Sequence, residues 1–312
     1  MRLAHISDLH LCTKYKRENI SRVETLIRHA LENGAQHFVF TGDISDNANE
    51  NDFIIFKEIL KKFDIYSSNK TTLVIGNHDI FGGPQTAQDL LKFPEKCSNT
   101  DYHQRVYNFV AHFKELFNGT YRLSEEIFFP FVKVLDKIAL IGINTIDVYS
   151  KLKNPFASNG HVSKAQRKAF GQLLFNHDLK DKIKVVLAHH HFYRKNVSSS
   201  SSKDSLWDKI ESFTMKLRGK KKLIKLFAEN NVKLVLHGHS HEMREYKRKE
   251  IKFLNAGASV DAYSSGNARL YLIDVFQNII SAELYVLEEV KTSTASHSYA
   301  PKFLSCVSSS GH

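Results

Sequence analysis

The sequence predicts an α/β fold, in which short buried strands alternate with helices. Five apolar runs are rich in β-branched or aromatic side chains, as buried strands are, and they cover residues 3–6, 38–41, 72–75, 185–188 and 234–236. Each run is followed by a motif of polar residues, most of them with glycine. Segments of helical pattern separate several of the runs, which favours parallel strands joined by helices.

The first part of the chain is predicted to repeat a strand–helix unit. A strand at residues 3–7 leads to a helix at 20–33, and a strand at 38–41 leads to a helix at 50–63. The strand at 72–75 ends at Gly76-Asn77-His78-Asp79. Residues 81–126 then form an insertion that opens with Gly82-Gly83-Pro84, a turn signal, and contains helices near 87–92 and 102–117.

The second part continues the alternation and then closes the sheets. Strands are expected at 129–135 and 138–143, and Ser163 is expected to cap a helix that extends to about 177. A second insertion, 194–222, contains the serine run 198–202 and a basic run. A helix at 223–230 leads to the strand that ends at His237, and strands at 251–256, 268–275 and 279–287 complete the sheets.

Composition favours one soluble domain. The motifs described below connect residues 8 to 241, so we assign residues 1–290 to one domain and residues 291–312 to a Ser-rich C-terminal tail. Hydrophobic residues make up 42% of the chain, enough for a core. Three widely spaced cysteines do not suggest a disulfide framework. The sequence has neither a secretory signal nor an apolar stretch near 18 residues, so we expect a cytoplasmic protein without membrane contact.

Side chains that bind metals follow all five apolar runs. They are Asp8, His10, Asp43, Asn77, His189, His239 and His241. Ligands bind beyond the carboxyl ends of strands in open α/β sheets, so we expect these side chains in one crevice. They exceed the needs of one tetrahedral ion and suit two ions of higher coordination that share a carboxylate. In an extended strand end, the i, i+2 spacing of the Asp-x-His and His-x-His pairs would point both side chains to one side.

Each motif residue also has a structural interpretation. Asp8 and Asp43 could cap the helices that follow them, and Asn77 could be an ordinary turn residue. Asn is a weak neutral ligand, which suits a catalytic ion better than a closed structural site. Of the three consecutive histidines 189–191, only one is expected to bind metal, and His189 and His191 would face the same side of an extended strand.

The motif set resembles that of the calcineurin-like metallophosphoesterases. Their pattern is D-x-H, G-D, G-N-H-[DE], H and G-H-x-H, and all five elements occur here in order. The resemblance implies a four-layer α/β/β/α sandwich of two mixed sheets flanked by helices. Within the group, the Gly-Asn-His-Asp ending and a length near 300 are most similar to the class III cyclic-nucleotide phosphodiesterases. The motifs of this chain depart from those of three other branches, so we do not expect it to belong to them. These branches are the phosphoprotein phosphatases, the purple acid phosphatases and the lipid A precursor pyrophosphatases.

The resemblance also implies roles for individual residues. Asp8, His10 and His241 would hold one metal ion, whereas Asn77, His189 and His239 would hold the other, and Asp43 would bridge the two. The family register selects His189 from the histidine run. His78 matches the family's catalytic histidine, which lies outside the metal ligands. The cofactors would be two divalent or trivalent ions, and the absence of cysteine ligands favours Mn, Fe, Zn or Co.

The expected activity is a binuclear metal-dependent phosphoesterase that hydrolyses phosphodiesters by attack of a metal-bridging hydroxide, with 3′,5′-cyclic nucleotides as candidate substrates. A nuclease or phosphomonoesterase of the same fold is the alternative. A non-enzymatic scaffold is disfavoured because the ligand set and His78 are intact. The sequence does not determine the oligomeric state.

The net charge of +11 and a pI near 9.3 suggest an anionic partner, such as a nucleotide, another phosphate ester or nucleic acid. Basic residues concentrate at 216–225 and 244–249. They are either a solvated face or a rim around the substrate. Tyr193 and Arg194 follow the histidine run, where an aromatic ring and a guanidinium group could stack on a base or bind a phosphate.

Overall fold

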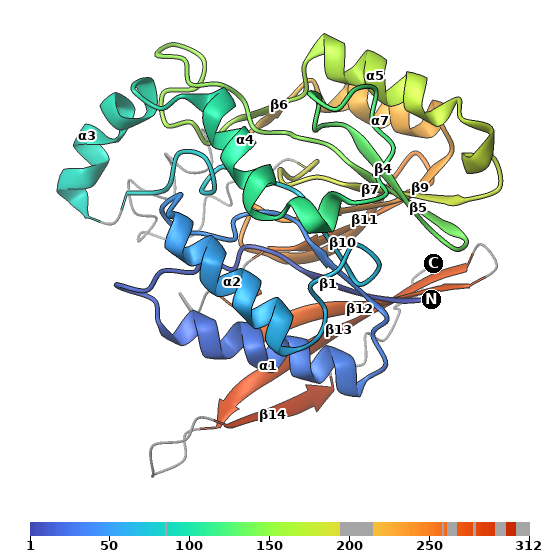
Figure 1. The fold of residues 1–312 in the computed structure, drawn as a ribbon, viewed down its shortest axis with the longest axis horizontal. Coiled ribbons are helices and arrows are strands. Elements are labelled where there is room, and N and C mark those ends of the chain that lie inside the picture. The colour runs from blue at the N-terminus through green and yellow to red at the C-terminus, as the bar shows by residue number, and fades with distance from the viewer. Residues whose placement is uncertain are drawn as a thin grey trace, which may run out of the picture.

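The computed structural model describes residues 1–84, 86–193, 215–257, 259–260, 267–276, 279–290 and 298–303, and it contains two six-stranded sheets (Figure 1). The first sheet has the order β14 (Ser298–Phe303), β13 (Ile279–Val290), β12 (Ala268–Phe276), β1 (Arg2–Ile6), β2 (His37–Phe40) and β3 (Thr71–Leu73). The second has the order β10 (Met243–Arg248), β11 (Ile251–Ala256), β9 (Val232–His237), β7 (Ile183–Leu187), β5 (Ile138–Gly142) and β4 (Phe131–Leu135). Two short strands, β6 (Gly160–His161) and β8 (Leu217–Arg218), pair separately.

Both sheets are mixed, and the motif-bearing strands are the parallel ones. β1, β2 and β3 run parallel in the first sheet, where β12 is antiparallel to β1. In the second sheet β5, β7, β9 and β11 run parallel, and the edge strands β4 and β10 are antiparallel to their neighbours. Parallel strands end at the same edge of a sheet, so this arrangement brings together the motifs that follow β1, β2 and β3, and likewise those that follow β7 and β9.

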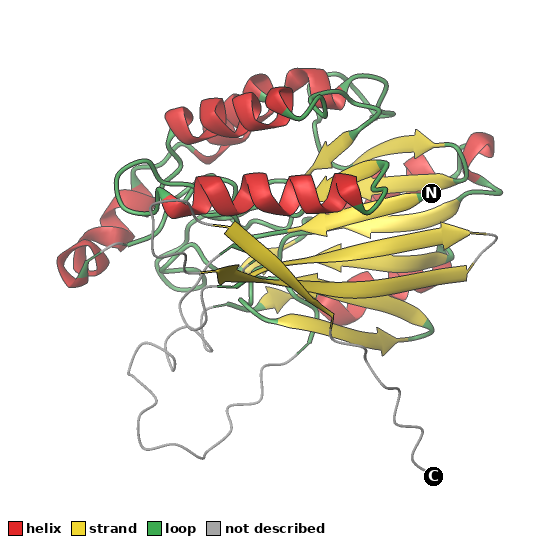
Figure 2. Ribbon diagram, turned by 90° about the horizontal axis from the view of Figure 1, so that it is seen from below, coloured by secondary structure: helices red, strands yellow, loops and turns green. Residues whose placement is uncertain are grey.

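Helices cover the outer face of each sheet, which confirms the four-layer α/β/β/α sandwich (Figures 1 and 2). α1 (Glu18–Glu32) and α2 (Glu50–Lys62) lie on the first sheet, and α5 (Lys164–Leu174) and α7 (Lys220–Glu229) lie on the second. α1 buries Val23, Leu26, Ile27 and Ala30, which share one helical face. The largest apolar cluster contains residues of both sheets, whereas a second cluster lies between the second sheet and its helices.

The first insertion forms helices beside the sandwich, as expected. α3 (Ala87–Ser98) begins with a capping box in which Thr86 and Asp89 bond each other's backbone N–H. α3 is longer than predicted because it continues past Pro94, which lacks only one backbone donor. α4 (Tyr102–His112) and η1 (Lys114–Phe117) complete the insertion.

Several elements differ from the sequence prediction. Residues 243–248 form the edge strand β10. The prediction missed this strand because most of its side chains are charged, so the sequence lacks the alternation of apolar and polar residues that indicates a strand. The helix predicted to reach 177 ends at Leu174, with η2 (His177–Leu179) after it. Within the predicted tail, residues 298–303 form β14 and pair with β13, whereas 291–297 and 304–312 lie outside the described residues. Most of the second insertion, 194–214, also lies outside them.

No helix within the described ranges combines the length and the apolar character that crossing a membrane requires.

Candidate metal centre

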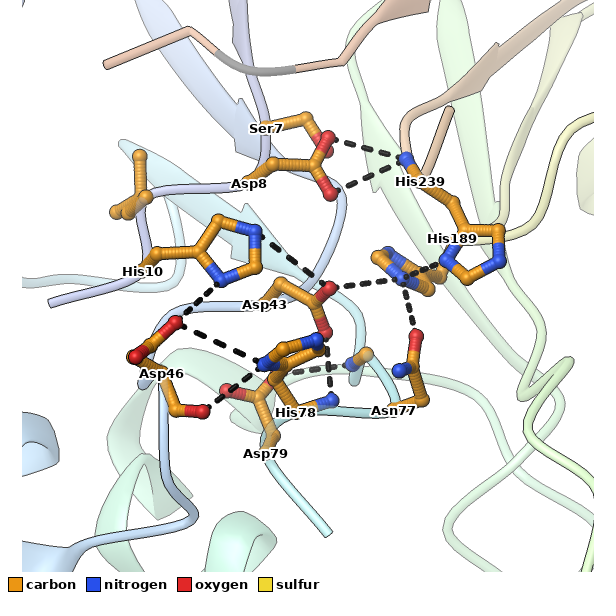
Figure 3. A network of polar contacts seen from close by, with 12 residues as sticks. Ser7, Asp8, His10, Asp43, Asp46, Asn77, His78, Asp79, His189 and His239 are labelled. Carbon is orange, nitrogen blue, oxygen red and sulfur yellow. Dashed lines mark hydrogen bonds and ion pairs between the residues drawn. The ribbon is translucent and has the colours of Figure 1, made fainter. Parts of the chain in front are cut away.

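Loops that follow five parallel strands carry the predicted ligands to one place between the two sheets, and Figure 3 labels all of them except His241. Asp8 and His10 follow β1, Asp43 follows β2, Asn77 follows β3, His189 follows β7, and His239 and His241 follow β9. Three groups among the described residues have their potential ligand atoms within 4.8 Å of one another, and two of them consist of predicted ligands, namely Asp8 with His10 and His241, and Asp43 with His189 and His239. The fold therefore assembles both halves of the predicted centre.

The backbone at these positions is not extended, contrary to the sequence argument from i, i+2 spacing. Positive φ values from 44° to 74° occur at five of the predicted ligands, Asp8, His10, Asp43, His239 and His241. This left-handed conformation costs a non-glycine residue about 1–2 kcal/mol, and such residues concentrate at functional sites. The turn after β1 is tied to the turn after β2, because the Asp8 N–H donates to the Gly42 carbonyl oxygen at 3.1 Å. Sharp turns, and not strand periodicity, make the side chains converge.

Close packing around the carboxylates explains the glycines of the motifs. A methyl group at Gly76 would lie 2.1 Å from Oδ1 of Asp43, and one at Gly238 would lie 2.4 Å from Oδ2 of Asp8. No side chain fits at such distances. The glycines therefore leave the space in which the two carboxylates sit.

The second group is centred on Nε2 of His189. This atom lies 3.0 Å from Oδ1 of Asn77, 3.1 Å from Nδ1 of His239 and 3.2 Å from Oδ2 of Asp43. All four residues are buried. Three atoms thus lie within hydrogen-bonding distance of this imidazole nitrogen: a neutral Asn oxygen, a carboxylate oxygen and a second imidazole nitrogen.

The first group is linked to the second through Asp43. Oδ2 of Asp43, which faces His189, also lies 3.9 Å from Nε2 of His10. Asp8 fixes the loop after β9, because its two carboxylate oxygens accept the His239 N–H at 3.1 and 3.0 Å. The His10 and His241 rings are 5.3 Å apart. Asp43 therefore has a single carboxylate oxygen that faces a histidine of each group.

The ring of His189 has the tautomer that a metal ligand needs. Nδ1 of His189 lies 2.8 Å from the Thr41 carbonyl oxygen, which can only accept, so Nδ1 carries the proton. Nδ1 of His10 faces the carboxylate oxygen Oδ1 of Asp46 at 3.1 Å, which is an ion-pair distance. Histidines that bind metals usually donate their other ring N–H to a carbonyl or carboxylate. Both Nε2 atoms then face Asp43, and this oxygen and nitrogen donor set fits divalent metal ions.

Neighbouring charges shift the pKa values of the cluster. Burial lowers the pKa of His189, but Asp43 outweighs it, and the pKa rises to about 9. Burial likewise lowers the pKa of His10, yet Asp46 and Asp43 raise it to about 9. For Asp8, burial exceeds the opposing effect of His189 and raises the pKa to about 6. Metal ions bind the deprotonated ligands, so they would replace protons that the metal-free cluster retains.

His78 lies at the edge of the cluster and is held from two sides. Its backbone N–H donates to Oδ1 of Asp43 at 2.8 Å, and its ring Nδ1–H donates to the Asp46 carbonyl oxygen at 2.9 Å. The side chain is 24% exposed, whereas that of His10 is 2% exposed. His78 also groups with His10 and Asp46 as potential ligands. Because Nδ1 is engaged with a carbonyl, Nε2 is the ring atom left to meet a substrate.

Two carboxylates of the site were not assigned by the sequence argument. Asp46 bonds Lys16 at 3.2 Å, faces His10 and orients His78. Asp79 accepts the N–H groups of Ser45 at 2.9 Å and of Gly76 at 2.8 Å, so it ties the loops after β2 and β3 together. The position of Asp46, three residues after Asp43, is the sequence signal that could have identified it.

Tyr193 and Arg194 were predicted to contact the substrate, and the structure describes only the first of them. Arg194 lies outside the described residues. Tyr193 is 3% exposed, and its hydroxyl contacts Ser240 and Glu242, so it supports the loop between His239 and His241. The guanidinium group of Arg244 lies 4.5 Å from the centre of the Tyr193 ring. The ring therefore contacts an arginine of the protein and is closed to solvent.

The neighbouring histidines serve the surrounding structure. His190 bonds the Thr145 hydroxyl at 2.9 Å through Nδ1 and the Ser158 carbonyl oxygen at 3.2 Å through Nε2. His237 bonds the Tyr246 hydroxyl at 2.8 Å. His191 stacks with His239, with ring centres 5.9 Å apart. Of the histidine run, only His189 belongs to the metal-ligand groups found in the described part of the chain.

Comparisons with solved structures show the same fold. A dimetal phosphatase from Danio rerio has a TM-score of 0.55 at 10% identity, over 92% of this chain and 95% of that one. A purple acid phosphatase from yellow lupin, Lupinus luteus, has a TM-score of 0.54 at 12% identity, over 91% of this chain and 51% of that one. No curated protein sequence matches significantly.

A family model bears on the activity of the chain. The model of the calcineurin-like phosphoesterases matches residues 1–243, which span all the motifs. The residue clusters that could hold metal ions lie within the same range. The chain therefore belongs to the calcineurin-like phosphoesterase family.

Proposed function

We propose that the protein is a phosphodiesterase that uses two metal ions. The observation that carries this proposal is the position of Asp43, whose Oδ2 faces His189 at 3.2 Å and His10 at 3.9 Å. Asp43 would bridge the ions. The remaining ligands divide into Asp8, His10 and His241 for the first ion and Asn77, His189 and His239 for the second.

The residues of the chain have defined tasks in this proposal. When bound, the ions would lower the pKa of water and neutralise charge that develops on the phosphoryl oxygens. His78 would stabilise or protonate the leaving oxygen, since Asp46 fixes its Nδ1 and leaves Nε2 for the substrate. Asp79 and Asp46 would hold the loops and His10 in place. Protonation of an alkoxide matters most for poor leaving groups such as a ribose oxygen.

The substrate class proposed is an anionic phosphodiester, with 3′,5′-cyclic nucleotides among the candidates. The support for this finer assignment is the Gly76-Asn77-His78-Asp79 motif, which resembles that of the class III cyclic-nucleotide phosphodiesterases. Basic residues near the site suit an anionic substrate. Manganese, iron, zinc and cobalt are the metals proposed.

Metal removal and restoration test the proposal. Chelator-treated protein should lose hydrolysis of bis-p-nitrophenyl phosphate and regain it with Mn²⁺, and elemental analysis should count two ions per chain. p-Nitrophenyl phosphate, a monoester with the same chromophore, should be hydrolysed more slowly. Full activity after complete metal removal would refute metal dependence, and a faster reaction with the monoester would instead indicate a phosphomonoesterase.

A further inference from the structure

A cavity of about 320 Å³ lies beside the candidate metal centre. Neither the proposed metal ligands nor His78 are among its described lining residues. Its size is at the lower end of small-molecule sites. Three loops and one helix of the described chain line it, through Cys12, Lys14, Tyr15, Asn47, Asn49, Gly83, Asp89, Lys92, Phe93 and Lys96. The loops follow β1, β2 and β3, which are strands that also carry metal-centre residues, and the helix is α3 of the first insertion.

The cavity adjoins the catalytic histidine proposed above. Gly83 lines the cavity, and a methyl group there would lie 2.3 Å from Cε1 of His78, so Gly83 is in direct contact with that ring. The Gly83 N–H donates to the Asp46 carbonyl oxygen at 3.1 Å, the same oxygen that accepts Nδ1–H of His78. A leaving group that meets His78 therefore has this cavity next to it.

The cavity is positively charged. Lys14, Lys92 and Lys96 line it, and none of them has an ion-pair partner within the described residues. Among the described lining residues, Asp89 is the only carboxylate, and it accepts the Thr86 N–H in the capping box of α3. By contrast Lys16, from the same loop as Lys14, is engaged by Asp46 at 3.2 Å.

The ammonium group of Lys96 is close to the turn that follows His78. A methyl group at Gly82 would lie 2.9 Å from Nζ of Lys96, and the Gly82 N–H donates to the His78 carbonyl oxygen at 3.1 Å. Nζ also lies 5.7 Å from the centre of the Phe93 ring. The cavity therefore offers an ammonium group on the side of His78, with an aromatic ring beside it.

We infer that the cavity binds a second phosphate group, carried by the leaving group of the substrate. This inference rests on the proposed function and narrows its substrate class to phosphate esters whose leaving group is itself phosphorylated. Water would add to phosphorus, the bond to the leaving oxygen would break with its electron pair, and a proton from the water would reach that oxygen through His78. The second phosphate remains intact and contacts Lys14, Lys92 and Lys96. A 3′,5′-cyclic nucleotide has only one phosphate and would leave the cavity empty.

A matched pair of dinucleotides tests the inference. In pTpTp, thymidylyl thymidine with a phosphate at both ends, either leaving nucleoside carries a second phosphate, whereas TpT has none. For the Mn²⁺-loaded protein, kcat/KM should be at least about tenfold higher for pTpTp than for TpT. This factor corresponds to the free energy of one charge-assisted hydrogen bond. The triple variant Lys14→Gln, Lys92→Gln, Lys96→Gln should reduce this ratio towards one. The control Lys164→Gln, Lys168→Gln, Lys180→Gln removes the same charge from exposed positions elsewhere and should preserve it.

Binding by calorimetry separates failure of this inference from failure of the proposed function. The metal-free chain should bind thymidine 3′,5′-bisphosphate about tenfold more tightly than thymidine 5′-monophosphate. This difference in affinity should disappear in the triple lysine variant of the cavity (the cavity variant) and persist in the control variant. Equal binding of the two nucleotides, or an unchanged pTpTp preference in the cavity variant, would overturn the inference. If no diester is hydrolysed with any metal, the proposed function fails, and the binding difference alone then decides whether the cavity takes a phosphate.

Discussion

Asp43 occupies the position on which the two-ion proposal depends. Because Oδ2 faces a histidine of each group, Asp43→Ala should lower metal occupancy at both sites. Asn77 bonds His189 of the second group at 3.0 Å, so Asn77→Ala should mainly empty the second site. Elemental analysis after dialysis gives both counts. Two ions retained in Asp43→Ala would contradict the bridging role.

His78 is expected to act on the leaving oxygen without binding metal. His78→Ala should keep both ions, lose about 10²–10⁴-fold in rate on a nucleotide diester and lose less on bis-p-nitrophenyl phosphate. The reason is that p-nitrophenolate departs without a proton, whereas a ribose alkoxide requires one. His177→Ala, at an exposed position on η2, is the matched control. Loss of metal, or equal losses on both substrates, would exclude the proton-donor role.

At the scale of secondary structure, Lys133 on β4 of the second sheet connects this strand to β3 of the first sheet and to η1. Its buried ammonium group donates to the carbonyl oxygens of Ser68 at 2.8 Å, Thr71 at 2.8 Å and Leu116 at 2.7 Å. Burial lowers the pKa of Lys133 to about 7. The three carbonyl contacts account for a lysine in the core, because its ammonium group, when protonated, satisfies three acceptors at once.

Replacing Lys133 should therefore weaken the junction of β3, β4 and η1. Lys133→Met keeps the length of the side chain but leaves three carbonyl groups without a donor, which should cost about 3 kcal/mol in the free energy of unfolding. Urea denaturation at pH 7 measures this loss. Lys137→Met, at an exposed position in the β4–β5 turn, should change little. Equal stability of the two variants would show that the carbonyl contacts contribute nothing net.

For the whole molecule, the basic segments 216–225 and 244–249 meet at Tyr193. Nζ of Lys220 donates to the Tyr193 carbonyl oxygen at 2.7 Å, and Arg244 lies over the ring of the same tyrosine. The Tyr193 hydroxyl contacts Ser240 between two proposed metal ligands. The two segments are thus joined close to the site, as a steering surface would require.

Neutralising this surface tests its role. The variant Lys221→Gln, Lys222→Gln, Lys247→Gln, Arg248→Gln should raise KM and flatten its dependence on salt, because exposed charges act over roughly 8–10 Å. The control Lys137→Gln, Lys164→Gln, Lys168→Gln, Lys180→Gln removes the same charge from other exposed positions. A KM that responds to salt identically in both variants would identify the basic segments as a solvated face.

The sequence by itself determined the α/β class and the main strands, and it predicted a set of candidate metal ligands. These features are local: a short apolar run followed by glycine and a polar motif specifies a buried strand and what stands at its end. The order of the five motifs was enough to indicate the family, which the match over residues 1–243 confirms. The roles of the individual ligands remain predictions.

Only the tertiary structure decided how those residues meet. Asp46 is 36 residues from His10, and no periodicity connects Lys14 with Lys92 and Lys96 across the cavity. The left-handed turns at Asp8 and His10 depend on hydrogen bonds to the loop after β2. Strand β10 forms because β11 provides its hydrogen-bonding partner, although its charged sequence does not favour a buried strand. Contacts between segments that are distant in the sequence create these features, so local sequence patterns cannot predict them.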